Sequence, residues 1–295
     1  MSSIFLTIFT PTYNRVELLP RLYQSIVDNN INGIEWLIVD DGSTDNTKQV
    51  VQGWIDEKII PIRYIYQENS GKYIAHNTGV LNAYGELFCC IDSDDLLAPN
   101  ATILLKNTWS KIKKEINVVG IVAYKNNFQD ICIGSPLPNQ EFVNYLDLRF
   151  IHKIHGDHLM AFRTEALKNN LFPVLPGTKF ITEAYLYSNV GHPGTYMYIL
   201  PKCLNVCEYR TDGYSRNMRN IRLSNPLGFK IFYRQEIDLS RDFLHRMINI
   251  MNYHIYSWIS KDKEYSYSGK YKLLVLLGKI PGLLWYIRFT RNNKE

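Results

Sequence analysis

The chain has 295 residues, a formal net charge of +5 and 46% hydrophobic residues. This length suits one large domain or a domain with an appendage, and the hydrophobic fraction excludes an intrinsically disordered chain. The odd number of cysteines argues against a disulfide framework, and their spacing does not match a zinc site. We therefore expect a cytoplasmic setting, and the first residues lack the basic region that precedes a signal peptide. The cysteines are Cys89, Cys90, Cys132, Cys203 and Cys207.

Apolar runs of strand length alternate with helical patterns over the first 122 residues. Such alternation predicts an α/β fold with a parallel sheet, whose ligands bind at the carboxyl ends of the strands. Ser43 or Thr44 is in position to cap the second helix. The predicted strands cover residues 4–9, 36–39, 62–66 and 87–91, and the predicted helices cover residues 15–27, 46–54 and 71–81.

Polar residues follow three of these strands, at 12–15, 40–45 and 92–95. Because the carboxyl ends of parallel strands share one edge, we expect these clusters to converge. The last cluster places three carboxylates in four positions, where they repel one another unless a cation or hydrogen bonds hold them. Asp92 and Asp94 have the D-x-D spacing that suits Mg²⁺ or Mn²⁺ bound together with phosphate oxygens. The alternative is an acidic start of a helix.

The second half of the sequence is less regular, and from Pro226 the pattern becomes helical. We therefore expect one domain made of two halves, followed by a helical C-terminal extension. The expected ranges are 1–122 for the first half, 123–222 for the second half and 223–295 for the extension.

Four motifs at the predicted strand ends occur in a fixed order. They read FTPTYNR at 9–15, VDDGSTDNT at 39–47, ENSGKYIAHNTG at 68–79 and DSDD at 92–95. Together they resemble the nucleotide-sugar-binding half of family-2 glycosyltransferases with the GT-A fold. The resemblance implies a Rossmann-like, mostly parallel sheet flanked by helices. It also implies a metal-dependent, inverting glycosyltransferase that takes its sugar from a nucleoside diphosphate sugar, UDP-linked, with Mn²⁺ or Mg²⁺ as cofactor.

The resemblance also implies roles for single residues. Tyr13 would stack on the base, and Asp41 would accept the ring N–H that uracil and thymine carry. Asp92 would contact the ribose or a metal-bound water, and Asp94 would ligate the cation. Alternatively, Asp41 is a turn aspartate and Lys72 a solvated helix residue. The expected contacts of the nucleotide sugar are Pro11, Thr12, Tyr13, Arg15, Asp41, Lys72, Asn77, Asp92, Ser93 and Asp94.

The family uses an Asp or Glu at the start of a later helix as catalytic base. Glu183 is the candidate here, because this sequence has Glu-Ala where many relatives have Glu-Asp; the alternative is an ordinary Glu in a first helical turn. Residues 155–165 and 208–217 resemble segments of capsule and O-antigen sugar transferases. Asp95, Asp157 and His158 are weaker candidates for contacts with the acceptor or the donor sugar. Two rivals remain, a nucleotidyltransferase and a catalytically silent sugar-nucleotide or glycan-binding protein.

The tail combines basic and apolar residues. Gly278, Lys279, Pro281 and Gly282 interrupt its apolar run, so two short amphipathic pieces that lie in a membrane interface fit better than a membrane span. We expect peripheral contact with the inner face of a bacterial plasma membrane, a glycan or lipid-linked acceptor, and no nucleic-acid partner. The alternative is a tail packed on the core of the protein. The basic residues are Lys261, Lys263, Lys270, Lys272, Lys279, Arg288, Arg291 and Lys294.

Overall fold

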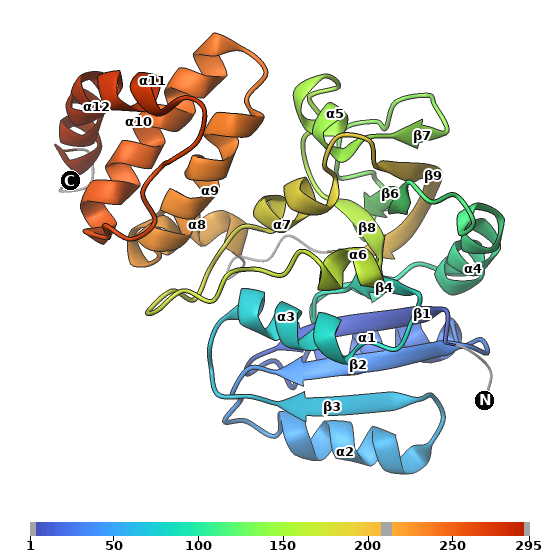
Figure 1. Ribbon diagram of the computed structural model, residues 1–295. Helices are drawn as coiled ribbons and strands as arrows, with labels where there is room; N and C mark the ends of the chain where they lie inside the picture. Colours follow the sequence, from blue (N-terminus) through green and yellow to red (C-terminus); the bar gives the residue numbers. More distant parts are fainter. Residues whose placement is uncertain (1–3, 208–213, 292–295) are drawn as a thin grey trace. The chain divides into compact units, whose positions relative to one another are not determined.

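A computed structural model describes residues 4–207 and 214–291 of the chain (Figure 1). The chain forms two compact units. The first unit contains residues 1–172 and 186–209, and the second contains residues 173–185 and 210–295. The helical extension expected over residues 223–295 therefore falls within the second unit.

In the described residues, nine strands form one sheet, which lies in the first unit. They are β1 (Leu6–Thr12), β2 (Ile34–Asp40), β3 (Ile62–Tyr66), β4 (Leu87–Cys90), β5 (Leu96–Leu97), β6 (Val118–Asn126), β7 (Phe142–Val143), β8 (His158–Arg163) and β9 (Tyr196–Val206). Their order is β3-β2-β1-β4-β8-β6-β9-β5, with β7 paired to β9. The strands β1 to β4 are mutually parallel, as predicted. The sheet as a whole is mixed, because β8 lies antiparallel between β4 and β6.

Helices cover both faces of the sheet (Figure 1). On one face, the first, second and fourth helices share a buried core with the strands, and Leu22, Val51 and Leu105 pack there with Ile8 and Ile38. The seventh helix begins in the second unit and ends in the first. The helices are α1 (Leu19–Asp28), α2 (Thr47–Glu57), α3 (Lys72–Asn82), α4 (Ala101–Ile112), α5 (Tyr145–Phe150), α6 (Thr164–Lys168) and α7 (Glu183–Val190).

Helix α3 packs closely on the opposite face of the sheet. The ring of Phe9 stacks on Phe88 with centroids 5.0 Å apart and meets the edge of His76 at 5.6 Å. A Cβ at Gly79 would lie 2.4 Å from the Phe9 ring, so a side chain there would push the helix off the sheet. This packing fixes the helix whose first residue is Lys72.

The loops after β1 and β2 are bonded to each other. Asn14 adopts φ +50°; its Oδ1 accepts from the amide of Thr44 at 2.7 Å, and its amide donates to Ser43 Oγ at 2.9 Å. Asp45 accepts from the amide and the hydroxyl of Thr47 at 3.0 and 2.6 Å. The prediction that Ser43 or Thr44 caps the second helix is therefore wrong. Both residues bond to Asn14, and the side chain of Asp45 satisfies the start of α2 instead.

Helices dominate the second unit. They are α8 (Tyr214–Ser224), α9 (Pro226–Leu239), α10 (Phe243–Ser260), α11 (Lys272–Leu277) and α12 (Lys279–Arg291). A small core joins Ile237 of α9, Ile250 and Tyr253 of α10, and Val275 of α11 with Tyr267. Burying side chains of this size contributes roughly 1.5–3 kcal/mol each, so the extension has a core of its own.

Residues 173–185 join this unit through contacts with α9. The rings of Phe180 and Phe229 stack with centroids 5.8 Å apart. The amide of Lys179 donates to Asn225 Oδ1 at 2.7 Å. A segment that comes before α7 in sequence is thus part of the helical unit.

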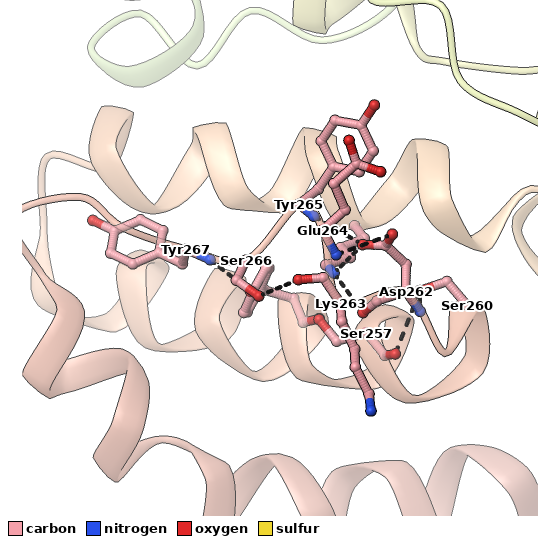
Figure 2. A network of polar contacts seen from close by, with 10 residues as sticks. Ser257, Ser260, Asp262, Lys263, Glu264, Tyr265, Ser266 and Tyr267 are labelled. Carbon is pink, nitrogen blue, oxygen red and sulfur yellow. Dashed lines mark hydrogen bonds and ion pairs between the residues drawn. The ribbon is translucent and has the colours of Figure 1, made fainter.

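A buried ion pair holds the turn after α10. Lys230, which is 1% exposed, places Nζ 2.6 Å from Asp262 Oδ2 and 3.0 Å from the Asp262 carbonyl oxygen. The same carboxylate accepts from the amides of Glu264 and Tyr265, within the polar network that Figure 2 shows. Since a single buried charge without a partner is strongly destabilising, the pair ties the turn to α9.

One face of the tail packs on α10. Val275 is buried, and its carbonyl oxygen lies 2.7 Å from His254 Nε2. A Cβ at Gly278 would lie 2.3 Å from Ile250 Cγ2, and one at Gly282 would lie 3.1 Å from His254 Cβ. The two glycines therefore allow the tail to approach α10. The chain forms two helical pieces that separate at Gly278. The sequence predicted two pieces, but it was wrong about Lys279, Pro281 and Gly282, which lie within α12 and do not interrupt it.

Candidate active site

The three aspartates of the D-x-D turn follow β4, and two lysines neutralise two of them. Lys72 Nζ lies 2.8 Å from Asp92 Oδ1 and 3.0 Å from Asp92 Oδ2. Lys125 Nζ lies 3.3 Å from Asp95 Oδ2, and both of these side chains are largely buried. Asp94 is half-buried and makes no ion pair with any residue of 4–207 or 214–291. Two of the three carboxylates thus have a cationic partner, and Asp94 has none in the part of the chain that the structure describes. Burial and the neighbouring aspartates still raise the pKa of the Asp95 carboxyl to about 7, although the charge of Lys125 opposes this.

The electrostatic surroundings of Asp94 disfavour its negative charge. Desolvation raises the pKa of Asp94, and the charge of Asp92 raises it further. Desolvation opposes the ionisation of Asp92 too, but the charges of Lys72 and Lys125 outweigh it and lower the pKa of that carboxyl. The charge of Arg15 lowers both pKa values, so this side chain also acts on the turn. A cation at Asp94 would relieve the cost of keeping its carboxylate ionised.

The turn fits a divalent cation that is bound together with a diphosphate. Among the described residues, no group of three His, Cys, Asp or Glu side chains could hold a metal ion by itself. Mg²⁺ and Mn²⁺ do not require such a cage, because one or two carboxylates can hold them when phosphate oxygens complete the shell. Asp94 and Asp92 would be the protein ligands, on either side of the buried Ser93. Asp94 is the better ligand, because Lys72 already contacts both oxygens of Asp92.

Asp41 holds the loop that leads into α3. Its carboxylate accepts from the amides of Ser70 and Gly71 at 2.9 and 2.8 Å and from Gln67 Nε2 at 2.7 Å. Its own amide donates to the carbonyl oxygen of Thr12 at 2.8 Å. Three donors leave this carboxylate about one free lone pair out of four. Asp41 thus fixes the backbone around the site and keeps limited capacity for a further donor.

The end of β1 offers an exposed ring beside a buried hydroxyl. Pro11 is buried and the side chain of Tyr13 is 48% exposed. Thr12 is 3% exposed, and its Oγ1 has no hydrogen-bond partner among the described residues. A buried hydroxyl without a partner is costly unless a ligand or water satisfies it, and an exposed aromatic ring can stack on a base.

For three predicted residues of the first unit, the contacts described are with parts of the chain other than the D-x-D turn. Asn77 is buried and bonds to the backbone of Phe172 in both directions, at 2.8 and 3.0 Å, so it braces the chain there. Asp157 is exposed next to β8. His158 Nε2 lies 2.9 Å from the carbonyl oxygen of Ser135, and desolvation lowers the pKa of the imidazole.

Glu183 is the first residue of α7 and is half-buried. It belongs to the second unit, whereas the other predicted site residues belong to the first. The resemblance noted over residues 208–217 falls partly on residues 208–213, which lie outside the described residues.

Lys125 is a site residue that the sequence motifs did not predict. It lies near the carboxyl end of β6, in the otherwise apolar run VVGIVAYKN. A lone lysine at the end of a buried strand is a usable signal, because buried lysines need a partner. The partner itself depends on how β6, β8 and β4 pair, which the local sequence does not disclose.

Residues 7–171 match the model of the family described as Glycosyl transferase family 2. Over 198 residues, the chain is 26% identical to an uncharacterized glycosyltransferase, RT0329, of Rickettsia typhi; the match covers 64% of this chain and 53% of that protein. The chain spans about half the length of this relative and a smaller share of several others.

Solved structures show the same fold. S. aureus TarS 1-349 in complex with UDP-GlcNAc has a TM-score of 0.58 at 18% identity, over 96% of this chain and 81% of that chain. The mannosyltransferase PcManGT from Pyrobaculum calidifontis, in complex with GDP-Man and Mn²⁺, has a TM-score of 0.56 at 19% identity, over 96% and 83%. These likenesses confirm the predicted GT-A-like fold, here a mixed sheet flanked by helices.

Proposed function

The chain belongs to glycosyl transferase family 2, and from this premise we propose that it is a metal-dependent, inverting glycosyltransferase. It moves a sugar from a nucleoside diphosphate sugar, UDP-linked, to a hydroxyl of a glycan or lipid-linked glycan. The observation that carries this proposal is the D-x-D turn. Lys72 and Lys125 neutralise Asp92 and Asp95, and Asp94 remains for a cation.

The donor site uses the ends of three parallel strands. Tyr13 stacks on the base, and Thr12 Oγ1 finds in the nucleotide the partner that it lacks within the described residues. The free lone pair of Asp41 accepts a base N–H. Asp94 ligates the cation, with Asp92 beside it. When bound, the cation stabilises the charge that develops on the departing diphosphate.

Glu183 is the base of the reaction. Its carboxylate takes the proton from the acceptor hydroxyl while that oxygen forms a bond to the anomeric carbon. The bond between the anomeric carbon and the diphosphate oxygen breaks on the opposite face, and the nucleoside diphosphate leaves. An α-linked donor therefore gives a β-glycoside. We place the reaction in the synthesis of a cell-surface polysaccharide of the capsule or O-antigen kind, because residues 155–165 resemble those transferases.

Asp94→Asn tests this function. A panel of nucleotide sugars is incubated with the protein and Mn²⁺, and release of nucleoside diphosphate is measured with and without a glycan acceptor. We expect turnover of at least one donor and a fall of about 100-fold or more in the variant, since it loses electrostatic stabilisation of the leaving group. Asp56→Asn, an exposed position on α2, is the matched control. Wild-type protein that binds nucleotide without releasing diphosphate would identify a silent binder, and release of pyrophosphate from a nucleoside triphosphate would identify a nucleotidyltransferase.

We also propose that the second unit contacts the inner face of the plasma membrane. Within the described residues, none of the helices has the length and apolar character needed to cross a bilayer. Many apolar side chains of α11 and α12 are exposed, and Lys272 and Lys279 on the same two helices are exposed too. An apolar face with basic residues suits an anionic membrane interface. The exposed apolar residues are Leu273, Leu276, Leu277, Ile280, Leu283, Leu284, Trp285 and Ile287.

A further inference from the structure

Lys125 is a buried cation behind the D-x-D turn. Its side chain is 16% exposed, that of Asp95 is 7% exposed, and Nζ lies 3.3 Å from Asp95 Oδ2. Neither charge could be buried alone without a large cost, so each depends on the other. The pair therefore fixes the direction of the Asp95 side chain, which points away from solvent.

Backbone hydrogen bonds close the turn that carries Asp94. The amide of Asp95 donates to the carbonyl oxygen of Asp92 at 3.0 Å, and the amide of Ile91 donates to Phe9 at 2.9 Å. After the turn, β5 pairs with β9 at Leu96. The turn is thus held by strands at both ends and by Lys125 at its last aspartate.

Sheet pairing brings Lys125 to this position. The ladder between β6 and β9 shifts register on both sides of Tyr124. Such irregularities redirect side chains near the end of a strand. Lys125 then pairs with Asn205 of β9, and Asn205 also pairs with Leu97 of β5. Lys125 and the strand that follows the aspartates are therefore aligned through one residue of β9.

We propose that Lys125 is a positioning residue of the cation site: by pairing with Asp95 it fixes the turn so that Asp94 meets the cation and the donor diphosphate. This inference rests on the proposed function. The inference and simple electrostatics predict opposite changes in cation affinity when Lys125 is replaced. Removing a nearby positive charge should tighten cation binding if only charge mattered, whereas loss of the turn geometry should weaken it.

The test uses Lys125→Met, the double variant Asp95→Asn with Lys125→Met, and Lys125→Arg. Free Mn²⁺ is measured by electron paramagnetic resonance during titration in the presence of UDP, at a temperature where circular dichroism shows each variant folded. We expect Lys125→Met to raise the Mn²⁺ concentration for half-saturation by about ten- to a hundredfold. In Lys125→Met the buried carboxylate of Asp95 has lost its partner, and it distorts the turn by moving toward solvent. The double variant also lacks the ion pair, but the neutral amide at position 95 can stay buried, so the turn should keep its shape and most of the loss should be recovered. Lys111→Met, an exposed position on α4, is the control.

The outcomes separate this inference from the proposed function. Wild-type protein that binds no Mn²⁺ with UDP would overturn the proposed function and the inference with it. Wild-type binding that Lys125→Met leaves unchanged or tightens would overturn the inference alone. A double variant that binds no better than Lys125→Met would also overturn it, since the pair would then not act through Asp95. If Lys125→Met does not fold, the double variant and Lys125→Arg decide, because both are expected to fold and to bind Mn²⁺ with UDP.

Discussion

The two units differ in the kind of side chain that they present at the surface. In the first unit, carboxylates at the strand ends are paired or hydrogen-bonded, as Asp41, Asp92 and Asp95 are. In the second unit, the ion pair between Lys230 and Asp262 is buried, while a row of large apolar side chains faces outward along α11 and α12. Soluble surfaces rarely leave such a row uncovered. This comparison underlies two proposals made above, that the first unit holds a charged ligand and that the second contacts an apolar surface.

Glu183→Gln tests whether the second unit also contributes to the chemistry. The amide keeps the shape of the side chain but cannot accept a proton, so we expect the chemical step to slow by roughly 10²–10⁴-fold. The apparent donor affinity should change little. Single-turnover transfer to an acceptor measures the effect, with Asp56→Asn on the exposed side of α2 as the control from the first unit. Near-normal transfer in Glu183→Gln would assign the base to the first unit, and a slow Asp157→Asn variant would identify that base.

Three serine substitutions on the exposed face test the membrane contact. Leu276→Ser, Ile280→Ser and Leu284→Ser together should weaken binding to anionic vesicles by about 100-fold, if each lost side chain contributes on the order of 1 kcal/mol. Sedimentation with vesicles at low salt measures binding, and donor turnover should persist. Ile116→Ser, at a 93% exposed position of the first unit, is the control.

These point changes are a sharper test than deleting the tail after Ser268. Such a deletion would remove Val275 and Tyr271, which pack in the core of the second unit. The deletion would therefore remove packing from α10 and the exposed apolar residues at the same time, and the two effects could not be separated. Full-length protein that ignores anionic vesicles at low salt would contradict the membrane proposal.

Gly278→Val tests how the tail packs on α10. The new side chain would collide with Ile250, and overpacking of this kind costs about 1–3 kcal/mol in free energy of unfolding. Thermal or denaturant unfolding measures the change. Gly53→Ala is the matched control in the first unit, because nothing lies within 4 Å of a Cβ there. A helical glycine in open space should gain about 0.5–1 kcal/mol when replaced by alanine. Equal stability of Gly278→Val and wild type would show that the tail does not pack as described.

The sequence predicted that the first four strands exist because buried parallel strands appear as short apolar runs. It ended the first strand too early, at residue 9, whereas β1 continues through Thr10 and Pro11 to Thr12. It placed the start of α1 too early: the helix begins at Leu19, since the residues after β1 are bonded to the next loop through Asn14 and Asp45. It also predicted that the polar clusters after β1 and β2 meet, and Asn14 bonds to both Ser43 and Thr44. It did not predict Lys125 as the partner of Asp95, because the register of β6 against β8 and β9 is set by long-range pairing. Local sequence patterns predict helices and strands, whereas the pairing of distant strands determines which charged side chains meet.

The chain enters the second unit twice, which limits how such a protein can be rearranged by gene fusion or truncation. Residues 173–185 pack with α9 through Phe180 and Phe229, and Gln235 Nε2 donates to the carbonyl oxygen of Tyr185 at 3.1 Å. A gene that ended before residue 210 would still encode this segment but none of its helical partners. The second unit is therefore not a module that recombination can exchange at a single junction. A functional chimera needs both segments from the same parent, which couples the helix carrying Glu183 to the inheritance of the C-terminal helices.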